Sequence, residues 1–427
     1  MNNTQDLKLE DEILPLFDFT FNFSSGKIVK DILLQPLESV DAIVQRQDIL
    51  KGFLANKDAF KEYSYSRFNL AELQDFLDTF SVGSFSIGKL RWQLTFSEKK
   101  RQQKRGKLIQ MVLLFHKLYS THLSKLDLQA FPPAYQQELK AVNQYFEDFK
   151  LDHYNALIRR QKFRVRHIAD LMRIITEKIN KGETPAFWER WFRFEAYLSV
   201  SNGIGKNNFV FPKFQEAGFS IEGLFHPLLK KPVKNDLQAN RNLILLTGPN
   251  MSGKSTFLKA VSLCVYLGHT GLAVPAASVS MPFFQCISVA INLTDSIVSG
   301  YSHFMTEVIT LKNVVEQAKE GKRCFAVFDE LFRGTNIEDA QEISTATIRG
   351  LIHFPQSLFF ISTHLHQLKD IDVIRDNKVS TWYIDCELKD NIPAFNYKLK
   401  EGWSDLKLGR ILFEKEGLNT LLPKTNL

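Results

Sequence analysis

The chain has 427 residues, 44% hydrophobic and 24% charged, which is typical of a globular protein with two or three domains. Its net charge of +7 favours an acidic partner only slightly, because a mild excess of lysine also aids solubility. No apolar run approaches about 18 residues, and the polar, acidic N-terminus does not have the order of a signal peptide, so we expect no membrane association. Four well-separated cysteines without a CxxC pair argue against zinc and favour the reduced thiols of a cytoplasmic protein.

Residues from about 30 to 200 are predicted to be mainly helical. Two apolar stripes recur at spacings of three and four: Leu139, Val142, Phe146 and Phe149, then Ile168, Leu171, Met172, Ile175 and Ile179. Such stripes are far more often helix–helix contacts than binding surfaces. We therefore expect residues 1–205 to form a helical core or lever domain.

Two basic runs interrupt this region, one from Ser97 to Lys107 and the other from Ile158 to His167. On long helices they could neutralise phosphates in a manner that depends on salt but not on base sequence. A solvated helix face is the more common fate of such runs, so both interpretations stay open.

The pattern changes near Ser201, where Gly and Asn interrupt the helix. Short apolar runs then alternate with helical stretches; the runs cover residues 209–211, 243–247, 324–328 and 358–362. This alternation predicts a mostly parallel sheet flanked by helices, in an α/β domain that covers residues 206–427.

The strongest motif is TGPNMSGKST, from Thr247 to Thr256, which matches the P-loop pattern through Gly248, Gly253, Lys254 and Ser255. An apolar strand precedes it and a helical pattern follows. Its glycines allow the backbone to surround phosphates, whose charge is favoured by backbone N–H groups and the helix N-terminus. Lys254 would reach the β- and γ-phosphates of ATP, and the Ser255 hydroxyl would ligate Mg²⁺.

A serine-containing segment, SGYSHFMTE, follows from Ser299 to Glu307. Ser302 is predicted to stand at a helix N-terminus, where N–H groups and the helix dipole favour an anion. A simple N-cap is a compatible interpretation.

The run CFAVFDE places two carboxylates at the end of a buried strand, at Asp329 and Glu330. Asp329 is positioned to hold Mg²⁺, and Glu330 to orient and deprotonate the attacking water. Because neighbouring residues of a strand point to opposite faces, we expect the two acids to have different tasks.

A further apolar run, FFISTHLHQL, leads to His364, which we expect to reach the γ-phosphate and the attacking water; His366 is assigned no role. An Asp-Glu pair and a later His at strand ends are the layout of ABC-type ATPases. Such enzymes usually share each ATP between two subunits, so Ser302 is the candidate residue offered to the partner's γ-phosphate.

Four segments together resemble the ATPase of the MutS family: TGPNMSGKST, DSIVSGYSHFMTE, FDELFRGTN and STHLHQL. Pro249-Asn250-Met251 and the DE-x-x-RGT pattern from Asp329 to Thr335 are especially typical of it. Phe225-His226-Pro227 resembles the entry to that domain, and residues 33–54 are similar to the start of the MutS helical core.

This resemblance implies an α/β P-loop ATPase domain of the ABC type behind a helical core, acting as a homodimer that grips DNA and recruits downstream repair proteins. The residues implied in ATP binding are Gly248, Pro249, Asn250, Met251, Ser252, Gly253, Lys254, Ser255 and Thr256. Asp329 and Ser255 would hold Mg²⁺, Glu330 would be the general base, His364 would sense the γ-phosphate, and Ser302 would act across the dimer.

The chain also departs from family members that read mismatches, which have two further N-terminal domains with a Phe-x-Glu reader in the first. Here the core-like segment begins near residue 30, so we expect a short form that lacks these domains.

Three functions remain open at this point. The first is an ATPase clamp that acts on mismatched or branched DNA in repair or recombination. The second is a non-catalytic DNA-structure scaffold that uses ATP only as a conformational switch. An ABC ATPase of another process, such as transport, is disfavoured by the missing membrane segments and by the DE-x-x-RGT pattern.

Overall fold

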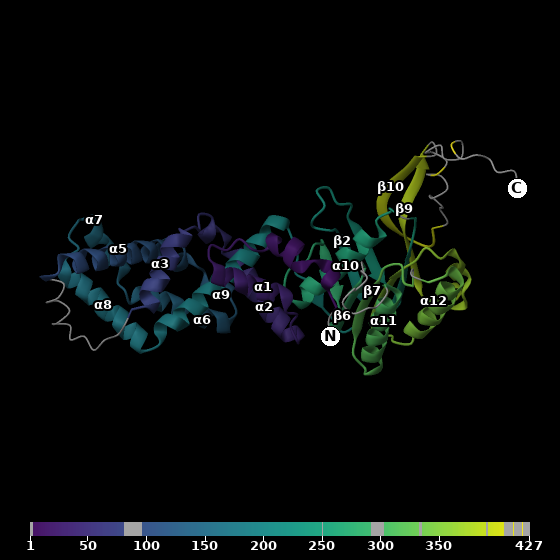
Figure 1. Ribbon diagram of the computed structural model, residues 1–427, viewed down its shortest axis with the longest axis horizontal. Helices are drawn as coiled ribbons and strands as arrows, with labels where there is room; N and C mark the ends of the chain where they lie inside the picture. Colours follow the sequence, from purple (N-terminus) through teal and green to yellow (C-terminus); the bar gives the residue numbers. More distant parts are fainter. Residues whose placement is uncertain are drawn as a thin grey trace. The chain divides into compact units, whose positions relative to one another are not determined.

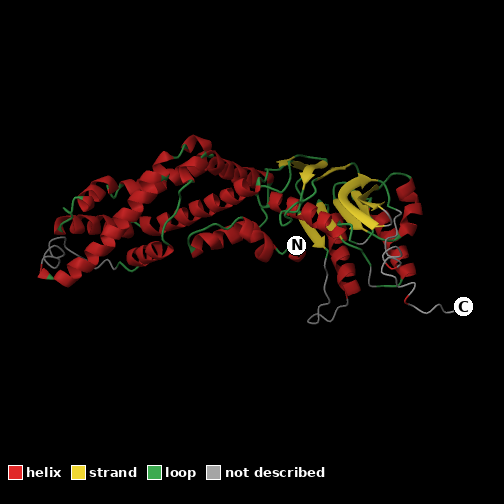
Figure 2. Cartoon of the chain, turned by 90° about the horizontal axis from the view of Figure 1, so that it is seen from above, coloured by secondary structure: helices red, strands yellow, loops and turns green. Residues whose placement is uncertain are grey.

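The computed structural model describes residues 3–80, 96–249, 251–291, 303–332, 335–389 and 392–404, together with 413 and 421. The chain divides into two units. The sheet unit comprises Met1–Ile13, Leu33–Val44 and Asn207–Leu427, and the helical unit comprises Leu14–Ile32 and Gln45–Lys206. The described strands all belong to the sheet unit, as Figure 2 shows. Within the described ranges, no helix combines the length and apolarity that a bilayer crossing requires.

Long helices make up most of the described part of the helical unit. The α-helices described there are α1 (Phe23–Leu34), α2 (Val40–Ala55), α3 (Arg67–Asp78), α5 (Glu98–Thr121), α6 (Pro133–Glu147), α7 (Leu151–Arg159), α8 (Val165–Asn180) and α9 (Glu183–Asn207). Three of them, α1, α2 and α9, include residues of the sheet unit at one end. Short 3-10 turns lie at η3 (Leu14–Leu16), η4 (Lys57–Phe60), η5 (Leu123–Lys125) and η6 (Leu128–Ala130). Helix α5 contacts both α7 and α8, and the three lie in one region of Figure 1.

The apolar stripes form the core of the helical unit, as predicted. All their members are buried except Ile179, which is partly exposed. Aromatic rings fill the space between the helices: the Phe146 ring lies 5.0 Å from Phe115, 5.2 Å from Phe187 and 5.7 Å from Trp191. Edge-to-face pairs of this kind add to the free energy gained by burial of the rings.

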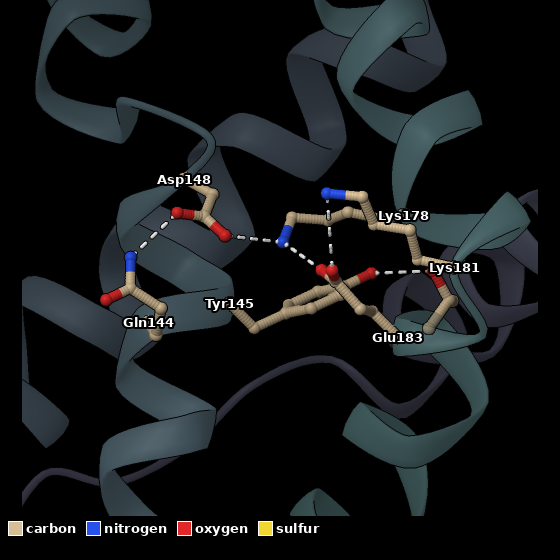
Figure 3. Close-up of polar contacts among 7 residues, drawn as sticks. Gln144, Tyr145, Asp148, Lys178, Lys181 and Glu183 are labelled. Atoms are coloured by element: carbon tan, nitrogen blue, oxygen red, sulfur yellow. Dashed lines mark hydrogen bonds and ion pairs between the residues drawn. The ribbon is translucent and has the colours of Figure 1, made fainter.

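A buried ammonium group joins the ends of α6, α8 and α9 (Figure 3). Lys178 Nζ donates hydrogen bonds to Asp148 Oδ2 at 2.7 Å and Glu183 Oε2 at 2.9 Å, and it lies 4.5 Å from the centre of the Tyr145 ring. Burial is the largest effect on the Asp148 carboxyl and raises its pKa. Hydrogen bonds from Lys178 and Gln144, together with the charges of Lys178 and Lys181, outweigh it, so the pKa lies below its ordinary value. The Lys178 side chain is only 5% exposed, and these partners offset the cost of burying its ammonium group.

We expect the change Lys178→Ala to lower the free energy of unfolding of the helical unit by about 2–3 kcal/mol, because it leaves both carboxylates without their cation. Urea denaturation followed by tryptophan fluorescence, to which Trp188 and Trp191 of this unit contribute, measures this. Lys181→Ala is the matched control, since that side chain is 70% exposed and lies 4.0 Å from Glu183. Equal destabilisation by the two changes would contradict the role of Lys178.

The described part of the sheet unit contains two sheets. The six-stranded sheet has the order β10-β9-β4-β8-β7-β6 and the four-stranded sheet the order β1-β5-β2-β3. The strands are β1 (Lys213–Phe214), β2 (Phe219–Leu224), β3 (Asn235–Ala239), β4 (Leu243–Thr247), β5 (Ser278–Met281), β6 (Cys286–Ala290), β7 (Cys324–Phe328), β8 (Leu358–Ser362), β9 (Ser380–Lys389) and β10 (Ile392–Glu401). The helices are α10 (Lys254–His269), α11 (His303–Lys319), α12 (Ile337–Leu351) and α13 (Asp372–Arg375), with the short turns η1 (Gln5–Leu7), η2 (Leu9–Ile13) and η7 (His366–Asp370).

The central strands of the larger sheet are parallel and fully buried, as the sequence predicted for residues 243–247, 324–328 and 358–362. The run at 209–211 instead forms only a single bridge, between Val210 and Val274. Helix α11 contacts β6 and β7, and α10 contacts β8 (Figure 1). Because β4, β8 and β7 are adjacent and parallel, their carboxyl ends lie at one edge of the sheet, which is where ligands bind in α/β folds.

The N-terminal segment pairs with the outer strand β6. Asn3 donates a backbone hydrogen bond to Ile287 and accepts one from Val289, at 3.1 and 2.7 Å, and Asp6 Oδ2 accepts the Ile291 N–H at 2.7 Å. The segment therefore covers backbone groups of the strand that would otherwise be unpaired. The predicted boundary at residues 205 and 206 stays a prediction, but residues 1–13 and 33–44 belong to the sheet unit and not to the helical one.

Candidate functional site

The glycine-rich motif forms the turn between β4 and the start of α10; we call residues 248–255 the motif loop. Gly248 and Gly253 have positive φ angles of 134° and 102°, which strain any residue with a side chain. A Cβ on Gly248 would lie 3.2 Å from Ser252 Oγ, and one on Gly253 would lie 3.2 Å from the Tyr397 ring. The two glycines thus keep open a concave backbone surface that Cβ atoms would fill.

The Lys254 ammonium lies inside this turn. It is the first residue of α10, and its Nζ donates hydrogen bonds to the carbonyl oxygens of Gly248 and Pro249, at 2.9 and 3.2 Å. Its Nζ is also 3.9 Å from Glu330 Oε1. Burial lowers the pKa of Lys254, while Glu330 and Asp329 oppose that shift. The ammonium is therefore held where it can meet an anion placed over the loop.

The Asp329 carboxylate connects three segments at the carboxyl edge of the sheet. Ser255 Oγ donates a hydrogen bond to Asp329 Oδ2 at 2.5 Å, and Ser362 Oγ donates one to Asp329 Oδ1. The Asp329 N–H donates to the carbonyl of Ala290, which ends β6. The structure thus brings the two predicted metal ligands, Ser255 and Asp329, into direct contact.

These two residues fit Mg²⁺. Oxygen is the ligand that Mg²⁺ prefers, and the ion usually keeps several waters and takes one or two protein oxygens together with substrate phosphates. A hydroxyl and a carboxylate in contact at the mouth of the motif loop match that set. Among the described residues there is no group of three or more His, Cys, Asp or Glu that could hold a metal by itself.

Glu330 lies outside strand β7, which ends at Phe328. The expectation that Asp329 and Glu330 occupy opposite faces of a strand is wrong, because Glu330 adopts a left-handed backbone with φ 51°. Its N–H donates to Ser362 Oγ at 2.8 Å, and its carboxylate approaches Lys254. The turn directs both acids to the motif loop, Asp329 against Ser255 and Glu330 against Lys254.

The other predicted site residues fall into three groups: exposed, buried, and outside the described residues. His364 lies two residues beyond the end of β8 with an exposed side chain, and Thr256 and Met251 are also exposed. Ser252 is fully buried, and its hydroxyl has no hydrogen-bond partner among the described residues. Asn250 and Ser302 lie outside the described residues, as do Arg333 and Gly334 of the DE-x-x-RGT pattern.

Ser362 is a site residue that sequence reasoning missed. It is fully buried, donates to Asp329 and accepts from the Glu330 N–H, so it fixes both acids. The available signal was a hydroxyl at the last position of an otherwise apolar strand. Its importance depends on the adjacency of β7 and β8, which the local sequence does not specify.

A cavity of roughly 450 Å³ adjoins the motif loop at Ser252 and Gly253. Its walls are mostly apolar and include Phe225, Val233 and Tyr397. Asn235 fixes the Tyr397 backbone: its Nδ2 donates to the Tyr397 carbonyl at 3.0 Å. This shape and polarity suit a flat ring attached to a group held in the loop. Sequence reasoning did not identify Tyr397 or Asn235.

The sheet unit is thus a mixed α/β domain with a glycine-rich loop and paired acids at one sheet edge, preceded in sequence by a helical region. Its residues 244–418 match the family model for MutS domain V. Over these residues the chain is similar to the MutS family.

Curated relatives are similar over part of their length. The DNA mismatch repair protein MutS of Listeria monocytogenes serotype 4a (strain HCC23) is 32% identical over 213 residues, which cover 48% of this chain and 24% of the relative. That of Oceanobacillus iheyensis is 28% identical over 223 residues, 50% of this chain and 25% of the relative. That of Lactobacillus acidophilus is 26% identical over 296 residues, 66% of this chain and 34% of the relative. The chain therefore spans about a quarter to a third of the relatives it matches.

Proposed function

We propose that the sheet unit is a P-loop ATPase domain of the ABC type that binds Mg²⁺–ATP in the motif loop and hydrolyses it. The contact between Ser255 and Asp329 supports this most directly, because it joins the loop to the acid-bearing strand end at the place where the metal would be held. Lys254 beside both acids completes a charge arrangement suited to a triphosphate. The unpartnered Ser252 hydroxyl and the α10 N-terminus add donors for its oxygens.

In this mechanism each residue has one task. Lys254 and the loop N–H groups neutralise the β- and γ-phosphates. Ser255 and Asp329 would hold the Mg²⁺, which would supply further positive charge beside these phosphates when bound. Glu330 accepts the proton of the attacking water. His364, beyond the adjacent strand end, contacts the γ-phosphate. The purine base occupies the apolar cavity and stacks on Tyr397.

Nucleotide binding and hydrolysis are expected to separate by mutation. Lys254→Ala should weaken ATP binding by roughly 10- to 100-fold, because it removes a charged hydrogen-bond donor. Tyr397→Ala should weaken it by roughly 10-fold through lost stacking, whereas Tyr397→Phe should not. Glu330→Gln should bind ATP normally but turn over roughly 10²- to 10⁴-fold more slowly. Equilibrium binding of a fluorescent ATP analogue and phosphate release measure the two steps; wild-type turnover in Glu330→Gln would overturn the base assignment.

We also propose that the protein is a homodimer in which Ser302 acts on the ATP of the partner. Helix α11 begins at His303, directly after Ser302, so its N-terminus would face an anion in the composite site.

Mixing inactive subunits tests this arrangement. A dimer of one Ser302→Ala and one Lys254→Ala subunit contains one composite site with both residues intact. An equal mixture should therefore recover about a quarter of the wild-type sites, while each variant alone stays inactive. Absence of any gain on mixing would argue against a shared site.

DNA is the proposed partner, bound through phosphate contacts of the helical unit. The second basic run contains five exposed cationic side chains in a stretch of eight residues: Arg159, Arg160, Lys162, Arg164 and Arg166. The first turns of helix α5 contain a second dense set of basic residues. Basic side chains at a helix N-terminus are unfavourable with the helix dipole, and a bound phosphate would offset this effect. ATP would then switch the protein between states that hold DNA differently, in mismatch repair or recombination.

The direct test is ATP turnover and binding with perfect, mismatched and four-way DNA at fixed salt. We expect DNA to stimulate turnover, and Arg160→Ala with Lys162→Ala to weaken binding equally on all three DNAs and to reduce the salt slope by about 2. Lys57→Ala with Lys61→Ala, at exposed lysines of the same unit, is the matched control. Stimulation by four-way but not mismatched DNA would indicate recombination, and no stimulation by any DNA would favour the scaffold.

A further inference from the structure

The backbone that follows Asp329 makes an unusual turn. Glu330 and Phe332 both adopt left-handed conformations, with φ 51° and 68°, although neither is a glycine. A left-handed conformation is unfavourable for a residue with a side chain and persists only where the surroundings fix it. A turn of this kind therefore needs specific partners if it is to hold Glu330 in one place.

Two buried side chains supply those partners. Ser362 Oγ accepts the N–H of Glu330 at 2.8 Å, and Glu307 Oε2 accepts the N–H of Phe332 at 2.7 Å. Glu307 belongs to α11, and its side chain is buried, with 3% exposure. The Phe304 ring, one turn earlier on the same helix, lies 6.0 Å from the Phe332 ring. Helix α11 thus holds the far end of the turn and β8 holds its near end.

The choice of a carboxylate at position 307 is informative. Burying a carboxylate is unfavourable unless its oxygens receive strong hydrogen bonds, and an apolar residue would pack in the same space at lower cost. A charge-assisted bond from a backbone N–H, in contrast, restrains the peptide geometry of a strained turn more firmly than apolar packing does. The geometry therefore assigns Glu307 to the backbone of residues 330–332.

We propose that Glu307 is a positioning residue for hydrolysis: it fixes the turn that aims the Glu330 carboxylate at the motif loop. This inference rests on the proposed role of Glu330 as the general base. Glu307 would act on the reaction through the Phe332 N–H and not by direct contact with the reacting atoms. Helix α11, which carries Glu307, begins directly after Ser302. This one helix would therefore present Ser302 to the ATP of the partner subunit and, through Glu307, position Glu330 for the ATP of its own subunit.

The test compares three changes at position 307 in the full chain. Glu307→Ala and Glu307→Asp remove or shorten the acceptor, and both should lower kcat by roughly 10- to 100-fold, the effect of a small misplacement of a reacting group. The Kd for ATP and the KM should change less than about 3-fold, because the motif loop is untouched. Glu307→Gln keeps an amide oxygen at the same reach and should retain most of the wild-type kcat.

Glu316→Ala, an exposed glutamate on the same helix, is the matched control and should behave as wild type. If Glu307→Ala does not fold, the milder Glu307→Asp decides. Folded Glu307→Ala or Glu307→Asp protein with wild-type kcat would overturn the proposal, as would Glu307→Gln as slow as Glu307→Ala. If the wild type itself does not hydrolyse ATP, or if Glu330→Gln retains its rate, the proposed function fails instead.

Discussion

The site depends on one carboxylate. Asp329 accepts hydrogen bonds from Ser255 at the start of α10 and from Ser362 at the end of β8, while its own N–H is bonded to the end of β6. These residues are far apart in sequence and meet only because β4, β8, β7 and β6 are consecutive parallel strands. The carboxylate can lie at this edge because both of its oxygens accept hydrogen bonds from hydroxyl groups. The bond from Ser255 also fixes the position of the motif loop relative to the end of β7.

The positions of the two other charged groups follow from that arrangement. Asp329 fixes Ser255, so the preceding residue, Lys254, is held against the loop carbonyls. The turn after Asp329 brings the Glu330 carboxylate close to Lys254 Nζ. Among the left-handed non-glycine residues of the unit, Glu330 and Phe332 form the turn after Asp329, Met251 lies in the motif loop, and Tyr397 lines the cavity beside it. Elsewhere in the larger sheet, the central strands are regular and apolar.

Much of this could be predicted from the sequence, and the reason is physical. Strands β4, β7 and β8 are buried on both faces, so each appears as a continuous apolar run with a polar residue at its last position or directly after it. The glycine-rich loop could be located because its spacing reflects a local backbone requirement. The sequence did not predict the pairing of Asn3 with β6, the role of Ser362 or the wall formed by Tyr397, because each depends on contacts between segments distant in sequence. The opposite-face rule failed at Glu330 because the strand had already ended.

The cavity beside the loop shows how such a contact between distant segments determines a binding surface. Tyr397 lies at the irregular part of the β9–β10 pairing, between Phe395 and Leu399, and has a left-handed backbone. Asn235, at the start of β3 in the other sheet, donates to the Tyr397 carbonyl and accepts the Leu399 N–H at 2.9 Å. One amide side chain therefore replaces the ladder hydrogen bonds missing at the bulge and holds the ring over Gly253. The wall of the cavity is set by backbone hydrogen bonding between the two sheets, so a ring bound there would contact both sheets and the motif loop at once.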